Sequence, residues 1–177
     1  MPRKTQTGFT LVELACSTAI VGALLSAALP ATDSLMQRQR LQAVAETLRT
    51  DLQEVRSMAV QRGSNLQLHF ETDTEGTCYI VHQGPEGSCK CDANHEARCE
   101  ANGQAIRTQW LPASQHVRLA GGRELRFAAG QGTVTPTATL TLTSDRGDSI
   151  KEVISVAGRI RVCTPDQRLG GLPVCPH

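Results

Sequence analysis

A strongly apolar segment lies near the start of the chain, between a short basic leader and the first proline of the helical region. Residues 9–29 contain a single charged side chain, the carboxylate of Glu13. A helix rises about 1.5 Å per residue, so a helix of this length spans the roughly 30 Å hydrocarbon core of a bilayer. A carboxylate within such a segment costs about 2.5–3.5 kcal/mol on insertion scales and usually marks a function. The pattern therefore predicts a membrane-spanning helix in which Glu13 has a specific partner.

The helical pattern resumes after Pro30 and continues to about residue 62. Apolar residues recur at three- and four-residue intervals, with charged residues such as Asp51 between them, as expected for an amphipathic helix packed on its own domain. Proline removes a backbone donor, so Pro30 marks either a kink or the exit from the membrane. Gly63 suits a helix C-cap. The apolar stripe consists of Leu41, Val44, Ala45, Leu48, Leu52, Val55 and Ala59.

Beyond Gly63 the pattern changes to short runs of alternating apolar and polar residues, which are typical of an antiparallel sheet. Gly121 and Gly122 suggest a tight hairpin, residues 145–148 a second turn, and Gly158 a third. The segment 84–102 is polar and cysteine-rich and is interpreted as an insertion held by disulfides. The expected strands are 65–71, 77–83, 105–110, 116–120, 124–127, 138–143, 149–156 and 159–163.

One short motif, the heptapeptide GFTLVEL at residues 8–14, resembles the processing site of type IV pilins and pseudopilins. The cleavage glycine, the phenylalanine that follows it and the glutamate five positions after the cut all fall in register. The resemblance implies that a prepilin peptidase cuts after Gly8 on the cytoplasmic side and methylates the new amine of Phe9. It also implies that Glu13 faces the amine of a neighbouring subunit during assembly. This amine would be the cation that a carboxylate in hydrocarbon requires.

An ordinary secretory signal is the alternative interpretation of this end of the chain. Arg3 and Lys4 would form its charged region, and cleavage would occur near residues 26–28. Such a signal leaves Glu13 unexplained. Because basic residues favour the cytoplasm, Arg3 and Lys4 hold the N-terminus inside. We therefore expect a single-pass protein of the inner membrane with a periplasmic C-terminal domain, which later enters a pilus or pseudopilus filament.

A long helix followed by a sheet resembles the type IV pilin architecture, and the order of elements is most similar to that of the FimT and GspH group of minor pilins. This resemblance implies an α+β fold. A long N-terminal helix, transmembrane in its first half, packs on a C-terminal antiparallel β-sheet or sandwich domain. The expected organisation is a leader at 1–8, the transmembrane and assembly half of the helix at 9–29, its amphipathic half at 30–63, and a periplasmic β-rich domain at 64–177.

Six of the seven cysteines lie in the part expected to be exported, where an oxidising compartment permits disulfides. Six cysteines allow 15 complete pairings, among which the sequence does not choose. The simplest pair is Cys163 with Cys175, which would attach the tail to the last strand and contribute about 3 kcal/mol in the chain-entropy estimate. Cys16, in the apolar segment, is interpreted as a small packing residue. The other four are Cys78, Cys89, Cys91 and Cys99.

Near the C-terminus, residues 158–161 read Gly-Arg-Ile-Arg and resemble the basic Gly-Arg-x-Arg element of FimT-type pilins, a group associated with DNA uptake in naturally transformable bacteria. Alternate residues of a strand share a face, so Arg159 and Arg161 would lie about 6.5–7 Å apart and could hold backbone phosphates of DNA. Arg168 could add a third contact from the tail. The alternative is that these arginines are solvated charges on an edge strand.

The distribution of charge is more informative than the formal net charge of +1. Residues 71–100 carry two basic and seven acidic side chains, whereas residues 101–177 carry nine basic and five acidic ones. A basic C-terminal half suits a local, salt-sensitive phosphate site. Aromatic residues make up only 3% of the chain, so few side chains are available to stack on bases. Any DNA binding should be weak and indifferent to sequence.

Other chemistry finds little support in the sequence. Three cysteines and a histidine within 89–99 could offer thiolates and an imidazole to zinc, but their spacing and an oxidising compartment favour disulfides. The chain has no nucleophile elbow, zinc-protease motif or phosphate loop. We expect no cofactor, no metal and no catalysis. The histidines within expected strands, which we interpret as ordinary sheet residues, are His69, His82 and His116.

Three functional hypotheses follow. The first is a minor pilin of a type IV pilus that also contacts the DNA phosphate backbone during natural transformation. The second is a GspH-like minor pseudopilin of a type II secretion filament with no nucleic-acid role. The third is a membrane-anchored periplasmic enzyme or metal-binding protein. In the first two, the partners are other pilin subunits, the prepilin peptidase and the inner membrane.

Overall fold

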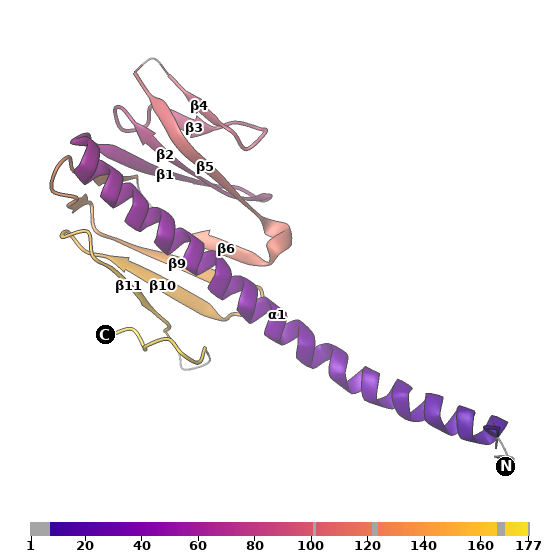
Figure 1. Ribbon diagram of the computed structural model, residues 1–177. Coiled ribbons are helices and arrows are strands. Elements are labelled where there is room, and N and C mark those ends of the chain that lie inside the picture. Colours follow the sequence, from indigo (N-terminus) through magenta and orange to yellow (C-terminus); the bar gives the residue numbers. More distant parts are fainter. Residues whose placement is uncertain (1–7, 101, 122–123, 166–168, 177) are drawn as a thin grey trace, which may run out of the picture. The chain divides into compact units, whose positions relative to one another are not determined.

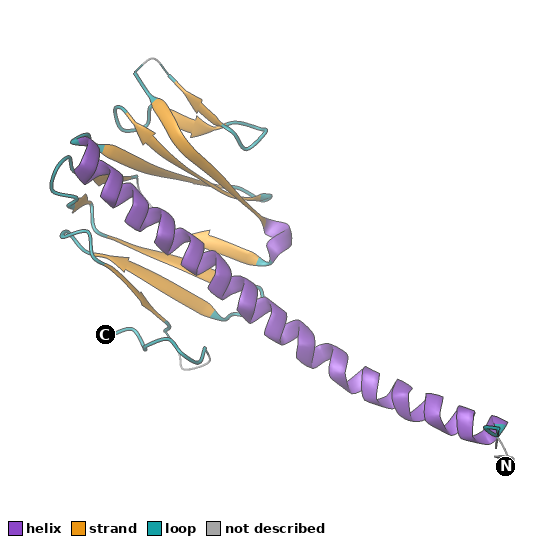
Figure 2. Ribbon diagram, viewed as in Figure 1, coloured by secondary structure: helices purple, strands orange, loops and turns teal. Residues whose placement is uncertain are grey.

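The computed structural model describes residues 8–100, 102–121, 124–165 and 169–176, without the side chains of Leu25 and of residues 27–31. Within these ranges a long helix precedes a series of strands and one short 3-10 helix (Figures 1 and 2). The elements are α1 (Leu11–Arg62), β1 (Leu66–Thr72), β2 (Gly76–Gln83), β3 (Cys89–Cys91), β4 (Ala97–Cys99), β5 (Gln104–Pro112), η1 (Ala113–Gln115), β6 (Val117–Ala120), β7 (Leu125–Phe127), β8 (Val134–Thr135), β9 (Ala138–Ser144), β10 (Ser149–Ile154) and β11 (Ile160–Cys163).

The chain divides into two compact units, residues 1–36 and residues 37–177. Within the first unit, the described residues form the first part of α1. The second unit contains the rest of α1 and every strand. The helix is assigned through Pro30 without interruption and ends at Arg62, followed by Gly63 with φ of 60°. The predicted helix and its glycine C-cap are therefore confirmed.

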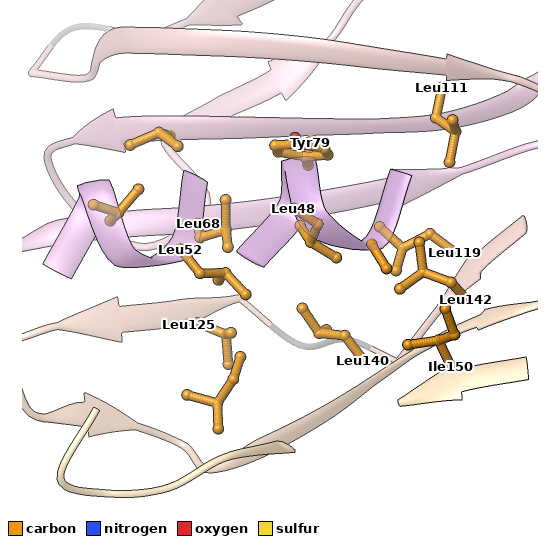
Figure 3. Packing of buried hydrophobic residues seen from close by; sticks show 14 of the residues in the cluster. Leu48, Leu52, Leu68, Tyr79, Leu111, Leu119, Leu125, Leu140, Leu142 and Ile150 are labelled. Atoms are coloured by element: carbon orange, nitrogen blue, oxygen red, sulfur yellow. The ribbon is translucent and has the colours of Figure 1, made fainter. Parts of the chain in front are cut away.

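The second unit has one main hydrophobic core, built between the C-terminal part of α1 and two antiparallel sheets (Figure 3). The predicted helical stripe is buried, with Leu41, Leu48 and Leu52 at 2% exposure or less, and Val44 is half-buried. Full burial of each leucine side chain contributes about 1.5–3 kcal/mol. Alternate residues of the strands meet this stripe, including Leu68 and Leu140, which explains the two-residue period read from the sequence.

The strands form two main sheets. In the view of Figure 1, β1, β2 and β5 lie on one side of the C-terminal part of α1 and β10 and β11 on the other. The five-stranded sheet has the order β5-β2-β1-β7-β8, and the four-stranded sheet has the order β11-β10-β9-β6. All pairings are antiparallel. The turns predicted at residues 145–148 and at Gly158 connect β9 to β10 and β10 to β11.

The hairpin predicted at Gly121 and Gly122 is wrong. The strands before and after it do not pair, because β6 joins β9 in the four-stranded sheet while β7 joins β1 in the five-stranded sheet. The chain therefore crosses from one sheet to the other here. Gly121 has φ of 115°, and a Cβ atom at this position would lie 2.3 Å from the carbonyl oxygen of Thr139. The glycine thus serves a close backbone approach, not a two-residue turn.

The predicted insertion at 84–102 contains a small hairpin, β3 with β4, that is tied by two disulfides. Cys78 of β2 is bonded to Cys91, and Cys89 is bonded to Cys99 across the hairpin. These sulfurs and Ile80 form a second, smaller hydrophobic cluster, against which Trp110 packs. The hairpin thus covers apolar residues of the five-stranded sheet that would otherwise face water.

A third disulfide joins Cys163 to Cys175, the pair that was expected from the sequence. The tail returns beside β11, since Thr164 donates to the carbonyl of Pro173 at 2.9 Å and Cys175 donates to the carbonyl of Thr164 at 2.9 Å. Leu169 is only 2% exposed and belongs to the main core. The tail is therefore packed onto the domain as well as crosslinked to it.

Candidate functional site

The segment around the predicted processing site begins helix α1. The hydroxyl of Thr10 accepts a hydrogen bond from the amide of Glu13 at 3.3 Å, which is the arrangement of a helix N-cap. Glu13 lies in the first turn, where a carboxylate interacts favourably with the helix dipole. Phe9 and Leu11 are more than 80% exposed. In the described part of the chain no side chain pairs with the Glu13 carboxylate.

Apolar side chains continue to face outward along this part of the helix. The exposed ones include Val12, Leu14, Ile20, Val21 and Leu24. Apolar surface of this kind marks contact with other proteins or with a membrane. Within the described ranges, no helix is both long and apolar enough to cross a bilayer.

The basic element near the C-terminus lies at a turn and not wholly within a strand. Strand β11 begins at Ile160, so Arg159 belongs to the turn. In this turn the amide and the hydroxyl of Ser155 donate to the carbonyl of Arg159, and the amide of Arg159 donates to the Ser155 hydroxyl. Arg161 lies in β11 opposite Val153. Both arginines are exposed. The expectation of one strand carrying both side chains is thus wrong, and Arg168 lies outside the described residues.

The local structure requires a glycine at the first position of this basic element. Gly158 is buried, with φ of 70°, and a Cβ atom there would lie 2.2 Å from the carbonyl oxygen of Gly132 and 2.6 Å from Nε of Arg56. The guanidinium of Arg56 donates to the carbonyls of Gly132 and Ala157, both at 3.2 Å. Arg56 thus ties helix α1 to two turns, and only glycine fits where they meet.

Replacing this glycine should therefore destabilise the turn that carries Arg159. We expect Gly158→Ala to lower the free energy of unfolding by at least about 2 kcal/mol, from left-handed backbone strain plus the clash with Gly132. Urea denaturation of the purified protein measures this. Gly147→Ala is the matched control, because Gly147 has φ of 85° but open space around it. Equal losses in the two variants would show that the close approach at Gly158 contributes nothing.

A polar groove lies beside Arg159. It has a volume of about 590 Å³ and runs between the last turns of α1 and the two turns that Arg56 connects. Glutamine and serine side chains of the helix contribute to its wall. The polar side chains that line the groove are Gln53, Arg56, Ser57, Gln61, Gln131 and Arg159. The groove carries two guanidiniums and no carboxylate, so it favours an anionic or polar group.

Helix α1 carries a buried ionic group that the sequence analysis placed on its polar surface. Asp51 is 5% exposed. Its carboxylate accepts a 2.5 Å hydrogen bond from the Tyr79 hydroxyl and a bond from Arg107, whose other nitrogen lies 2.9 Å from Glu54. Burial raises the pKa of the Tyr79 phenol far above its usual value, and the bond to Asp51 adds to the rise. The network joins α1 to β2 and β5.

Glu152 is a second buried carboxyl group that the sequence analysis missed. It lies on the inward face of β10 at 0% exposure, and neither of its oxygens has a hydrogen-bond partner. Nε of Arg49 on α1 is also buried without a partner. Burial raises the pKa of Glu152 to about 8, although the charge of Arg49 opposes the rise. The alternation of Ile150, Glu152 and Ile154 was the signal that could have revealed it.

Two of the three histidines expected in strands lie in them, His69 in β1 and His82 in β2. The prediction for His116 is wrong, because His116 precedes β6 and is the C-cap of η1. His82 is 0% exposed and contacts Glu124 at 2.9 Å through Nε2 and the hydroxyl of Ser88 at 3.4 Å through Nδ1. Burial lowers the pKa of His82, although Glu124 opposes this effect. Glu124 also accepts the amide of Gly87 at 2.8 Å. These contacts attach the insertion to the start of β7.

The residues considered as zinc ligands are not available to a metal ion. Cys89, Cys91 and Cys99 are all in disulfides, and His95 stacks on Trp110 with ring centres 3.5 Å apart. Across the described ranges no group of three or more histidine, cysteine or acidic side chains is arranged to hold a metal ion.

Two family models match the chain, and together they cover both ends of the architecture described above. The model for the prokaryotic N-terminal methylation motif matches residues 3–29, which include Gly8, Phe9 and Glu13. The model for type II transport protein GspH matches residues 44–168, more than half of the chain. The chain belongs to the GspH family. The predicted FimT and GspH resemblance is therefore confirmed at the level of this family.

Two solved proteins share the fold of this GspH-family protein. The minor pseudopilin EpsH from the type 2 secretion system of Vibrio cholerae is 15% identical, with 71% of this chain and 98% of that chain covered and a TM-score of 0.50. The type IV minor pilin FimU of Pseudomonas aeruginosa is 22% identical in one crystal form, with 72% and 91% covered and a TM-score of 0.52. No curated protein sequence matches the chain. The predicted α+β pilin-like fold is confirmed.

Proposed function

We propose that this GspH-family protein is a minor pilin or pseudopilin that is held in the inner membrane by residues 9–29 and then incorporated into a filament. The observation that carries this proposal is the combination of a methylation motif over residues 3–29 with a GspH domain over residues 44–168. In this proposal the peptidase cuts after Gly8 and methylates Phe9. Glu13, which lies among exposed apolar side chains of the helix, then meets the amine of a neighbouring subunit.

The proposed role is structural and not enzymatic. The domain uses its buried ionic groups to join secondary-structure elements, as Asp51 does between α1, β2 and β5. Its exported cysteines are crosslinked, which favours a filament subunit over the periplasmic metal-binding protein that was the third hypothesis.

Filament membership is tested by shearing surface filaments from cells and probing the sedimented fraction for this chain. We expect the chain in that fraction if it serves a pilus. If it serves a secretion pseudopilus, we expect it in crosslinks with secretion components at the inner membrane. Its absence from both assemblies would contradict the proposal.

A second candidate function is contact with DNA through Arg159 and Arg161. The observation in its favour is that both side chains are exposed and that Arg159 lines a polar groove without carboxylates. Arg168 is included from the sequence alone. Because phosphate contacts are electrostatic, such binding should fall steeply as salt rises.

The DNA contact predicts that Arg159→Ala with Arg161→Ala weakens binding of a labelled duplex by roughly tenfold at low salt and lowers the salt slope by about 2. Fluorescence polarisation with the full chain in non-ionic detergent measures both quantities. Lys90→Ala with Arg98→Ala is the control, because it removes two exposed cations from the β3–β4 hairpin. Wild-type affinity in the Arg159 and Arg161 variant would exclude this contact.

A further inference from the structure

The outer face of the four-stranded sheet has an unusual composition. Alternation along β6, β9, β10 and β11 turns one set of residues toward the core and the other away from it. The outward set is polar or basic at most positions and contains no carboxylate. Its members are Arg118, Ala120, Thr139, Thr141, Thr143, Ser149, Lys151, Val153, Arg161 and the disulfide-bonded Cys163.

The register of the strands spreads three cations diagonally across this face. Arg118 of β6 is paired with Thr143, Lys151 of β10 is paired with Thr141, and Arg161 of β11 is paired with Val153. Neighbouring strands lie about 4.8 Å apart, and residues two positions apart on one strand lie about 6.8 Å apart. Each cation therefore occupies a different row of the sheet, and the diagonal ends beside the turn that carries Arg159.

These cations are available to an external anion. Neither Lys151 nor Arg161 forms an ion pair with a described residue. Arg161 is exposed and Lys151 is half-buried. The Arg118 side chain is 79% exposed. Among the described residues its acidic neighbour is Asp145, which lies at 4.0 Å and also contacts His116 at 2.7 Å. These four strands contain one acidic residue, Glu152, and its side chain points inward. The outer face therefore carries no carboxylate from the strands.

The rest of the face indicates what kind of anion it fits. Val153, at 36% exposure, is the only large apolar side chain on it, so the face has little apolar area for a stable protein interface or for insertion into lipid. The row of threonines on β9 supplies hydroxyl donors between the cations, and hydroxyl and cationic side chains together are the common contacts to backbone phosphates. A flat surface of this chemistry suits a linear polyanion.

We propose that the outer face of the four-stranded sheet binds the phosphate backbone of DNA through Arg118, Lys151 and Arg161. This proposal rests on the DNA contact proposed above and extends it from one turn to a path across the sheet. No aromatic side chain lies on this face, so the binding is independent of base sequence.

The test is the affinity of the full chain, in non-ionic detergent, for a labelled duplex over a range of salt concentrations. Arg118→Ala with Lys151→Ala leaves residues 158–161 intact and removes two cations from outward positions. We expect roughly tenfold weaker binding at low salt and a salt slope lower by about 2. The control, Lys90→Ala with Arg98→Ala, has the same change in net charge and should bind within about twofold of wild type.

The outcomes separate this proposal from the contact at the turn. If the Arg118 and Lys151 variant binds as well as wild type while the Arg159 and Arg161 variant does not, the path across the sheet is wrong and the contact at the turn stands. If wild type does not bind the duplex at low salt, both are wrong. If wild type binds vesicles containing an anionic phospholipid but no duplex, the face serves a membrane and the proposal is overturned.

Discussion

Replacing Glu13 by leucine should abolish entry of the protein into a filament while leaving the domain folded. In the proposed assembly, the carboxylate pairs with the amine of a neighbouring Phe9 inside the apolar core. Removing one member of a buried ion pair costs about 3–5 kcal/mol because the other charge is left without a partner. The fraction of the chain recovered in filaments should therefore fall more than tenfold.

The folded domain should not respond to this change. Glu13 lies in the unit formed by residues 1–36, and the described side chains include no partner for it. Membrane insertion should also be maintained, since leucine is more favourable than glutamate in hydrocarbon. Filament fractions, membrane fractions and thermal unfolding of the same variant measure the three expectations together.

Ser17→Leu is the matched control for Glu13→Leu. Ser17 lies one helical turn further on and donates its hydroxyl to the backbone carbonyl of Glu13 at 2.7 Å. The control adds the same apolar side chain to the same helix face but keeps the carboxylate. Normal assembly of Glu13→Leu would exclude the amine pairing. Equal failure of both variants would mean that the helix face, and not the carboxylate, is what assembly requires.

The second large effect is expected at Glu152. Its pKa is about 8 in the folded protein and 4.5 in the absence of burial. Below pH 4.5 the Glu152 carboxyl is protonated in both the folded protein and the unfolded chain, so it contributes nothing to the pH dependence of stability there. Between pH 4.5 and 8 the unfolded chain ionises while the folded protein keeps the proton. Stability from this group therefore falls as pH rises, by about 1.4 kcal/mol per unit.

Glu152→Gln should remove this dependence, because glutamine has nearly the same shape and no charge. We expect the variant to be about 3 kcal/mol more stable than wild type at pH 7, with the difference shrinking toward zero below pH 4.5. Urea denaturation at several pH values provides the measurement. Glu96→Gln, at an exposed position in the turn between β3 and β4, is the control and should follow the wild-type profile. A constant difference between wild type and Glu152→Gln would contradict an ionising group at this position.

Most of the sheet could be predicted because alternation and turn residues are local signals. All eight expected strands are present, although their ends shift by up to two residues. The missing strands, β3, β4 and β8, are two or three residues long, and the first two lie in a segment where disulfides replace an apolar pattern. Alternation identifies the faces of a strand but not its neighbour, which is why Gly121 was assigned to a hairpin.

Functional residues, like strands, could be predicted from the sequence where the signal is local and could not where it depends on tertiary contacts. Gly8, Phe9 and Glu13 form a local motif that a sequence shows directly. Asp51 could not be recognised as buried, because its position on the helix is polar by pattern and only the approach of Tyr79 and Arg107 encloses it. Tertiary contacts of this kind are not encoded in local periodicity.

Processing and assembly of the chain as a pilin-like subunit are tested by the intact mass of the protein extracted from membranes. If the peptidase cuts after Gly8, the mass corresponds to a chain that begins at Phe9 and carries one added methyl group. A chain that begins near Leu29, as after cleavage of an ordinary secretory signal, would contradict processing as a pilin-like subunit.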